Sequence, residues 1–138
     1  MGPEPDTDTQ RIIGCAMKVH RVLGPGFLEV VYQNALAHEL SKSGFSVECH
    51  RRIKVMYDGI HVGDYVADML VGGGVIIENK AVEKLATIHE VQLVHYLTAT
   101  GLDVGLLINF GSPRLQFKRK TRLYQRMRSP VSPIVLMF

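Results

Sequence analysis

The chain has 138 residues, of which 46% are hydrophobic and 21% are charged, and its formal net charge is +3. These values fit one globular domain with a buried core and exclude a largely disordered chain. No apolar run approaches the roughly 18 residues that span a bilayer, and residues 1–10 lack the segments of a secretory signal. Cys15 and Cys49 lie far apart and form no metal-binding pair, which favours reduced thiols in a cytoplasmic protein.

Two helices are expected first. Residues 9–22 carry apolar side chains at helical spacing, and Gly-Pro-Gly at 24–26 ends this helix. The second helix is expected over residues 27–43, with Gly44 in the position of a C-terminal cap. Five apolar residues form the face of this helix that is expected to pack on the core: Leu28, Val31, Ala35, Leu36 and Leu40.

Three strands are expected next, at residues 45–55, 60–71 and 75–81. The first two flank Tyr57-Asp58-Gly59, which is a strong hairpin-turn signal. Three glycines at 72–74 predict the turn into the third strand.

The remaining elements are a helix over residues 87–100, ended by Gly101, and strands at 104–110 and 115–124. Three antiparallel strands followed by a helical crossover predict an α/β (α+β) fold, in which helices flank a mixed β-sheet.

One domain is expected over residues 10–124, between a flexible tail at 1–9 and a C-terminal tail at 125–138. The last ten residues, 129–138, combine two Ser-Pro steps with an apolar end. This composition fits either a mobile tail or a contact for a partner chain, such as the second subunit of a homodimer.

Positive charge gathers at the C-terminal end, because no acidic residue follows Asp103. Seven of the sixteen Lys and Arg residues lie beyond it: Arg114, Lys118, Arg119, Lys120, Arg122, Arg126 and Arg128. Such a segment attracts polyanions, and Arg114, Lys118, Lys120 and Arg122 are the expected contacts to a nucleic-acid backbone. A solvated edge strand kept soluble by its charges is the alternative.

Glu78 and Lys80 interrupt the apolar run of residues 75–81, which belongs inside a sheet. Side chains alternate along a strand, so these two must project from the same face. The pair fits either an internal ion pair at the sheet edge or a metal ligand beside a lysine that positions water or stabilises charge on a phosphate.

Asp68 is again a single carboxylate in an apolar strand. If the glycines at 72–74 form a hairpin, the strand of Asp68 lies next to the strand of Glu78. Adjacent carboxylates repel each other unless a cation lies between them, and oxygen ligands of this kind suit Mg²⁺ or Mn²⁺. The two acids therefore predict a metal site, with an accidental carboxylate pair as the alternative.

Glu29 supplies a third acid, in the first turn of the second helix. Acids favour helix N-termini for electrostatic reasons alone. However, Glu29 shares a helix face with Tyr32 and Leu36, and this face is expected to point inward.

The third helix carries Gln92 and Tyr96 at positions i and i+4. This polar stripe fits a solvated helix edge, or two groups that orient water and a scissile phosphate. His89 and His95 match no zinc spacing and are expected at the surface or behind the site.

Two sets of residues carry a resemblance to a known family. Gly26-Phe27-Leu28-Glu29-Val30-Val31-Tyr32 has the pattern after which the GxxExxY proteins are named. The ordered set of Asp68, Glu78-Asn79-Lys80, Gln92 and Tyr96 resembles the PD-(D/E)-x-K nuclease superfamily, especially its RecB-like branch. The resemblance covers residues 10–122. It departs at Val66, where an arginine often stands, and at Asn79, where an apolar residue is usual.

The resemblance implies a restriction-endonuclease-like core and a hydrolase that cuts phosphodiester bonds with a divalent metal, acting on DNA rather than RNA. In such a site Glu29, Asp68 and Glu78 would hold Mg²⁺ or Mn²⁺. Lys80 would serve the attacking water, and Gln92 and Tyr96 would support the site. The alternative is a non-catalytic nucleic-acid- or protein-binding module that keeps the fold. The presence of all three acids together with the lysine argues against it.

Overall fold

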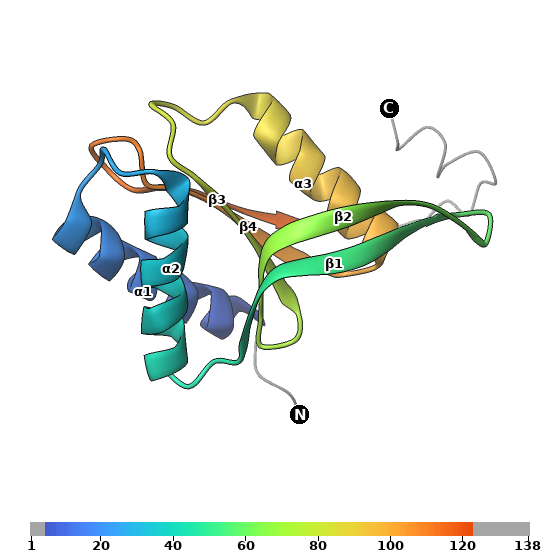
Figure 1. Ribbon diagram of the computed structural model, residues 1–138, viewed down its shortest axis with the longest axis horizontal. Helices are drawn as coiled ribbons and strands as arrows, with labels where there is room; N and C mark the ends of the chain where they lie inside the picture. Colours follow the sequence, from blue (N-terminus) through green and yellow to red (C-terminus); the bar gives the residue numbers. More distant parts are fainter. Residues whose placement is uncertain (1–4, 123–138) are drawn as a thin grey trace.

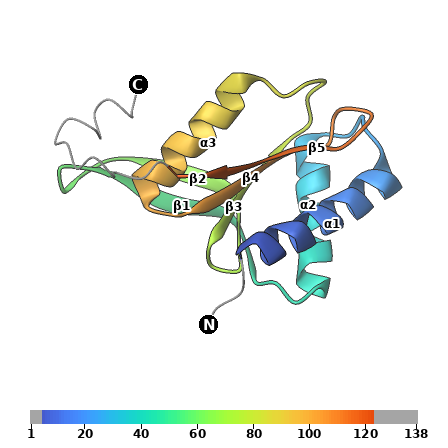
Figure 2. The ribbon, with the colours of Figure 1, turned by 180° about the vertical axis from the view of Figure 1, so that it is seen from behind.

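The computed structural model describes residues 5–122, which form one five-stranded mixed sheet with helices on both faces (Figures 1 and 2). The elements follow the predicted order: α1 (Pro5–Leu23), α2 (Glu29–Lys42), β1 (Val47–Tyr57), β2 (Ile60–Val71), β3 (Val75–Lys80), α3 (Thr87–Thr100), β4 (Val104–Asn109) and β5 (Gln116–Thr121). The predicted α+β fold is therefore confirmed.

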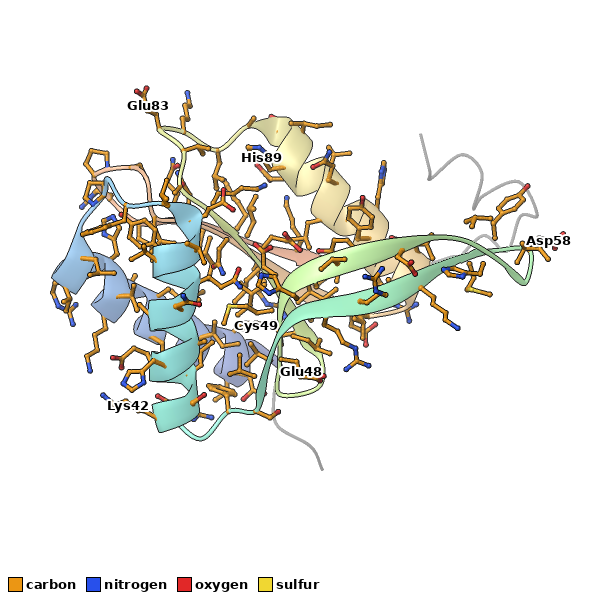
Figure 3. All side chains as sticks on the ribbon, viewed as in Figure 1. Lys42, Glu48, Cys49, Asp58, Glu83 and His89 are labelled. Atoms are coloured by element: carbon orange, nitrogen blue, oxygen red, sulfur yellow. The ribbon has the colours of Figure 1, made fainter. Side chains whose placement is uncertain are left out.

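The strands lie in the order β1-β2-β3-β4-β5. Only β3 and β4 run parallel, because α3 carries the chain back across the sheet between them. The β1–β2 hairpin turns at Asp58 and Gly59, which have φ of 54° and 75°, as a two-residue turn with positive φ at both positions requires. This hairpin extends beyond the other strands as an arm, with Asp58 at its tip (Figures 1 and 3).

Two apolar clusters hold the helices to the sheet. One joins α1 and α2 to a sheet face through residues such as Leu36, Met69 and Ile77. The other joins α3 to the opposite face through residues such as Leu97 and Ile76. None of the helices in residues 5–122 is both long and apolar enough to cross a membrane.

The helices at the N-terminal end differ from expectation in two places. Residues 5–9, expected in a tail, form the start of α1, and Thr9 is buried. Proline is tolerated in a first helical turn because its missing N–H would have no partner there. Leu28, expected in the core, is 76% exposed, since it precedes α2 as the N-cap residue. The tail expected at 125–138 and the basic Arg126 and Arg128 lie outside the described residues.

Candidate active site

The site lies where β2 and β3 separate. Their backbones pair over only three positions, from Val71–Val75 to Met69–Ile77. At the next position Asp68 and Glu78 meet, and their side chains take the place of the backbone ladder. Asp68 Oδ2 accepts a hydrogen bond from the Asn79 N–H (2.8 Å), and Glu78 Oε2 accepts one from the Asp68 N–H (3.4 Å). The separation of the strands thus brings the two acids together.

The opposite edge of β2 is irregular at the same position. The register places His50 of β1 across from Asp68, but the two residues form no bridge, and His50 has a φ of 56°. Its Nε2 lies 3.2 Å from Nε2 of Gln33, a buried residue of α2. A left-handed non-glycine residue marks local strain, and here it coincides with the missing bridge between His50 and Asp68.

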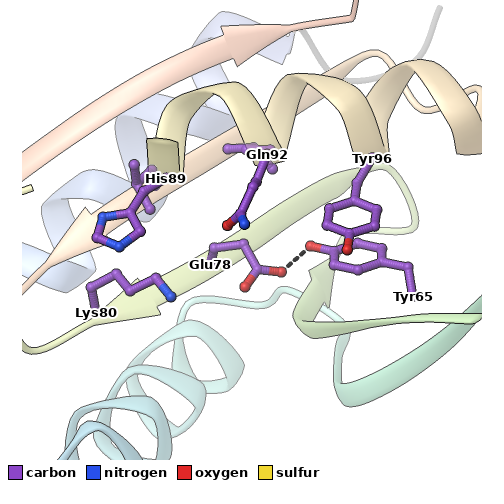
Figure 4. A pocket seen from close by; sticks show the side chains of 8 residues that line it. Tyr65, Glu78, Lys80, His89, Gln92 and Tyr96 are labelled. Carbon is purple, nitrogen blue, oxygen red and sulfur yellow. Dashed lines mark hydrogen bonds between the residues drawn. The ribbon is translucent and has the colours of Figure 1, made fainter. Parts of the chain in front are cut away.

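Glu78 and Lys80 project together from β3 towards α3 and line a narrow cavity (Figure 4). Three polar residues of α3 complete one wall: His89, Gln92 and Tyr96. Tyr65 of β2 forms the far side, where its hydroxyl donates a hydrogen bond to Glu78 Oε2. Asp68 adjoins this cavity and is not part of its lining.

Burial and the adjacent charge of Asp68 raise the pKa of Glu78 to about 7. The Tyr65 hydroxyl, the Asp68 N–H and the positive charge of Lys80 oppose this rise, because they stabilise the carboxylate. Burial, together with the charge of Glu78, raises the pKa of Tyr65, which therefore stays protonated as a donor. The site thus concentrates negative charge in a poorly solvated place.

Two carboxylates in this arrangement can serve a divalent cation. Mg²⁺ is commonly bound by one or two carboxylates, with waters and substrate phosphates filling its other positions. Within residues 5–122, no group of three His, Cys, Asp or Glu side chains is placed to hold one ion. Asp68 and Glu78 therefore fit a cation as a pair.

Glu29, the third predicted acid, does not line the cavity. It is the first residue of α2 and is exposed, whereas Tyr32 and Leu36 on the same helix face are buried. The expectation that Glu29 points inward with them is wrong, because the buried face of α2 begins only at Tyr32, about one turn after Glu29. Its predicted part in metal binding stays a prediction.

The basic strand β5 forms the edge of the sheet, and its charges are partly neutralised. Lys120 Nζ lies 2.7 Å from Glu90 Oε1 of α3, and Arg122 Nε lies 2.7 Å from Asp103 Oδ1. The lack of acidic residues after Asp103 therefore does not leave these two positive charges uncompensated. Glu90 and Asp103 precede them in the sequence but lie beside them in the fold. Arg114 and Lys118 are exposed.

Two cavity residues escaped the sequence analysis. Strict alternation along β2 would place Tyr65 and Ala67 on one face and Asp68 and Leu70 on the other. Instead, Tyr65 and Ala67 share an apolar cluster with Leu70. The alternation is therefore broken near Asp68, and nothing in the sequence predicts this break. His89 was expected outside the site. It lines the cavity, and its Nδ1 accepts a hydrogen bond from the Ala86 N–H (3.2 Å) at the start of α3.

Comparison with known proteins yields one match. A sequence model described as the PD-(D/E)XK nuclease superfamily matches residues 6–120, a range that contains both acids and the lysine of the cavity. The matched model describes the superfamily as a whole, so the resemblance to the GxxExxY proteins stays a prediction. No curated protein and no solved structure matches the chain.

Proposed function

The chain belongs to the PD-(D/E)XK nuclease superfamily, and from this premise we propose that it is a divalent-metal-dependent nuclease that hydrolyses phosphodiester bonds of DNA. One observation carries the proposal. Asp68, Glu78 and Lys80 meet at the separation of β2 and β3, beside a cavity that opens between the sheet and α3.

In this proposal Asp68 and Glu78 hold Mg²⁺ or Mn²⁺. A cation held there would supply Lewis-acid chemistry: it would lower the pKa of a water molecule and offset charge on the phosphate. Glu29, at the exposed start of α2, is the proposed third acid of the site.

The residues around the carboxylates provide the remaining functions. The Lys80 ammonium, a compact charge on a flexible stem, stabilises the negative charge that develops at the phosphate. The side-chain amide of Gln92 can orient the attacking water, because its Oε1 accepts and its Nε2–H groups donate hydrogen bonds, and Tyr96 supports the substrate beside it. Arg114, Lys118, Lys120 and Arg122 attract the nucleic-acid backbone. A cytoplasmic location is also part of the proposal, because the free cysteines Cys15 and Cys49 suit a reducing compartment.

The alternative is a binding module that keeps the fold without the chemistry. The hydrogen bond from Tyr65 to Glu78 Oε2 favours it, because the hydroxyl already occupies one of the two carboxylate oxygens that a cation would use. The proximity of the two acids favours the nuclease, because a purely structural site gains nothing from two carboxylates that repel each other.

Cleavage and metal binding together test the proposal. The purified protein is incubated with labelled linear, circular and single-stranded DNA, and with RNA, in the presence and absence of Mg²⁺ or Mn²⁺. We expect cation-dependent cleavage that Asp68→Asn and Lys80→Ala each abolish. We also expect Mg²⁺ or Mn²⁺ to raise the Tm of the parent but not of Asp68→Asn, because a ligand of the native state stabilises it.

Asp64→Asn is the matched control, since Asp64 lies on the same strand in an exposed pair with His61 and Arg52. It should cut like the parent. A parent that neither cuts nucleic acid nor shows a cation-dependent Tm would point to the binding module instead. Undiminished cleavage by Asp68→Asn would place the active site elsewhere.

A further inference from the structure

An aromatic pair stands at one end of the cavity. The rings of Tyr65 and Tyr96 are stacked, with centroids 3.8 Å apart and planes inclined by 7°. Tyr65 is only 7% exposed, whereas Tyr96 keeps 36% of its surface exposed. Tyr65 therefore covers one face of the Tyr96 ring from below, while Tyr96 remains available at the rim of the cavity (Figure 4).

The pair is held rigidly. Tyr65 belongs to the apolar cluster beneath α3, and its hydroxyl is bonded to Glu78. The stack of Tyr96 on Tyr65 fixes the second ring against the first. A flat ligand that joins such a stack loses little free energy to the ordering of protein side chains, because these are already ordered.

The cavity itself is small. Its empty space is about 280 Å³ even when the part open to solvent is included, which is below the ~300–1,000 Å³ of pockets that enclose a drug-sized ligand. A phosphate can reach Glu78 and Lys80, but the attached base must remain at the rim. Tyr96 lies one helical turn beyond Gln92, or about 6 Å along α3, a distance on the scale of one nucleotide.

We infer that Tyr96, backed by Tyr65, is a stacking platform for an unpaired nucleobase next to the scissile phosphate. This inference rests on the proposed nuclease function and names its substrate class: single-stranded nucleic acid, or a duplex with an unpaired end. In an intact duplex each internal base is already stacked on its neighbours, so its face is not free to cover the tyrosine. Base–aromatic stacking is tolerant of sequence, because every base has a flat face.

Binding of a fluorescent base tests the inference without requiring cleavage. Single-stranded DNA carrying one 2-aminopurine, the corresponding RNA, and a blunt duplex are titrated with the protein in Ca²⁺, with Mg²⁺ and Mn²⁺ withheld. We expect the parent and Tyr96→Phe to quench the fluorescence of a single strand. Tyr96→Leu should lose the quenching and bind single strands about tenfold more weakly, with its affinity for the blunt duplex unchanged.

Tyr57→Leu is the matched control, because Tyr57 is an exposed tyrosine next to the tip of the β1–β2 arm. It should bind like the parent, and a melting curve for each variant verifies its fold. The DNA and RNA arms show which polymer supplies the base. Tyr96→Leu with parental quenching, or with an equal loss on blunt duplex, would overturn the inference. Cleavage of blunt duplex by the parent in Mg²⁺ would still uphold the nuclease in that case.

Discussion

Two polar side chains on neighbouring strands, the buried Asn109 of β4 and the half-buried Glu78 of β3, differ in how fully their hydrogen-bonding atoms are satisfied. Asn109 is fully satisfied. Its Oδ1 accepts hydrogen bonds from the N–H groups of Val82 (2.9 Å) and Gly111 (3.0 Å), and its Nδ2 donates to Val82 O and to Gln116 Oε1 (both 2.9 Å). These four bonds fasten the chain that follows Lys80 to the end of β4.

Glu78 is not satisfied in this sense. Its hydrogen bonds fall on Oε2 alone, and the neighbouring Asp68 adds a charge that repels its own. A neutral amide with every partner in place stabilises a loop. A carboxylate held beside another carboxylate costs stability, unless a cation or a proton neutralises it. The contrast separates a structural polar group from one that the fold keeps available for chemistry.

The largest effect, on cleavage, should come from a substitution of Glu78, the charged residue of this comparison. Glu78→Gln keeps the shape of the side chain but removes its charge, so cation-dependent cleavage should fall at least about 100-fold. Its stability without added metal should equal or exceed that of the parent, because the repulsion by Asp68 is gone. Initial cleavage rates and urea unfolding measure the two effects. A variant that retains full activity would show that Glu78 is structural after all.

Asn109, whose hydrogen bonds are all made, should matter for stability. Asn109→Leu removes the hydrogen-bond partner of two backbone N–H groups, of the Val82 carbonyl and of Gln116 Oε1, so it should lower the free energy of unfolding by about 2–4 kcal/mol. Asn34→Ala, on the exposed side of α2, is the control and should change it little. Urea unfolding gives both values. A loss below about 0.5 kcal/mol for Asn109→Leu would mean that water replaces the lost partners.

The pH dependence of stability sharpens the comparison further. The pKa of Glu78 is raised from an ordinary value of 4.5 to about 7 in the folded chain, so the folded state holds the proton more tightly. The contribution of Glu78 to stability is therefore present below pH 4.5 and lost as the pH rises to 7, a change of about 1–3 kcal/mol. Glu78→Gln should lack this loss. The free energies of unfolding of parent and variant, compared from pH 5 to pH 8, should diverge; parallel curves would contradict the assignment.

The element order, the β2 and α3 boundaries and the glycine turns were predicted from the sequence, because apolar periodicity and turn residues act locally. The same rules placed Glu78 and Lys80 on one face. They failed for Tyr65, because the alternation of side chains along β2 is broken at Asp68, where the bridge to His50 is missing. They also failed for the inward position of Glu29 and for the charge pairs of β5. These features depend on where the core ends and on contacts distant in sequence, which local patterns do not encode.

The smallest effect is expected at the surface, where Lys118 and Lys120 of β5 differ in whether their charge is already paired. Lys118 and Lys120 alternate with Arg119 on β5 and so share one face of the strand. Lys120 is paired with Glu90, and this contact lowers the pKa of the Glu90 carboxyl. Lys118 has no carboxylate within ion-pair distance among residues 5–122, although it lies near enough to Glu90 to contribute to that shift. Of these two lysines, Lys118 is therefore the one whose ammonium group is available to a phosphate without breaking an ion pair.

If β5 contacts the nucleic-acid backbone, Lys118→Ala should weaken binding to all sequences alike and reduce the slope of log affinity against log salt by about 1. Lys120→Ala should have a smaller effect, because the parent Lys120 must leave Glu90 before it can reach a phosphate. Filter binding or fluorescence anisotropy from low to moderate salt measures both slopes. Equal slopes for the parent and both variants would show that β5 is a solvated edge whose charges serve solubility, and would assign the salt dependence to cations nearer the cavity, Lys80 first among them.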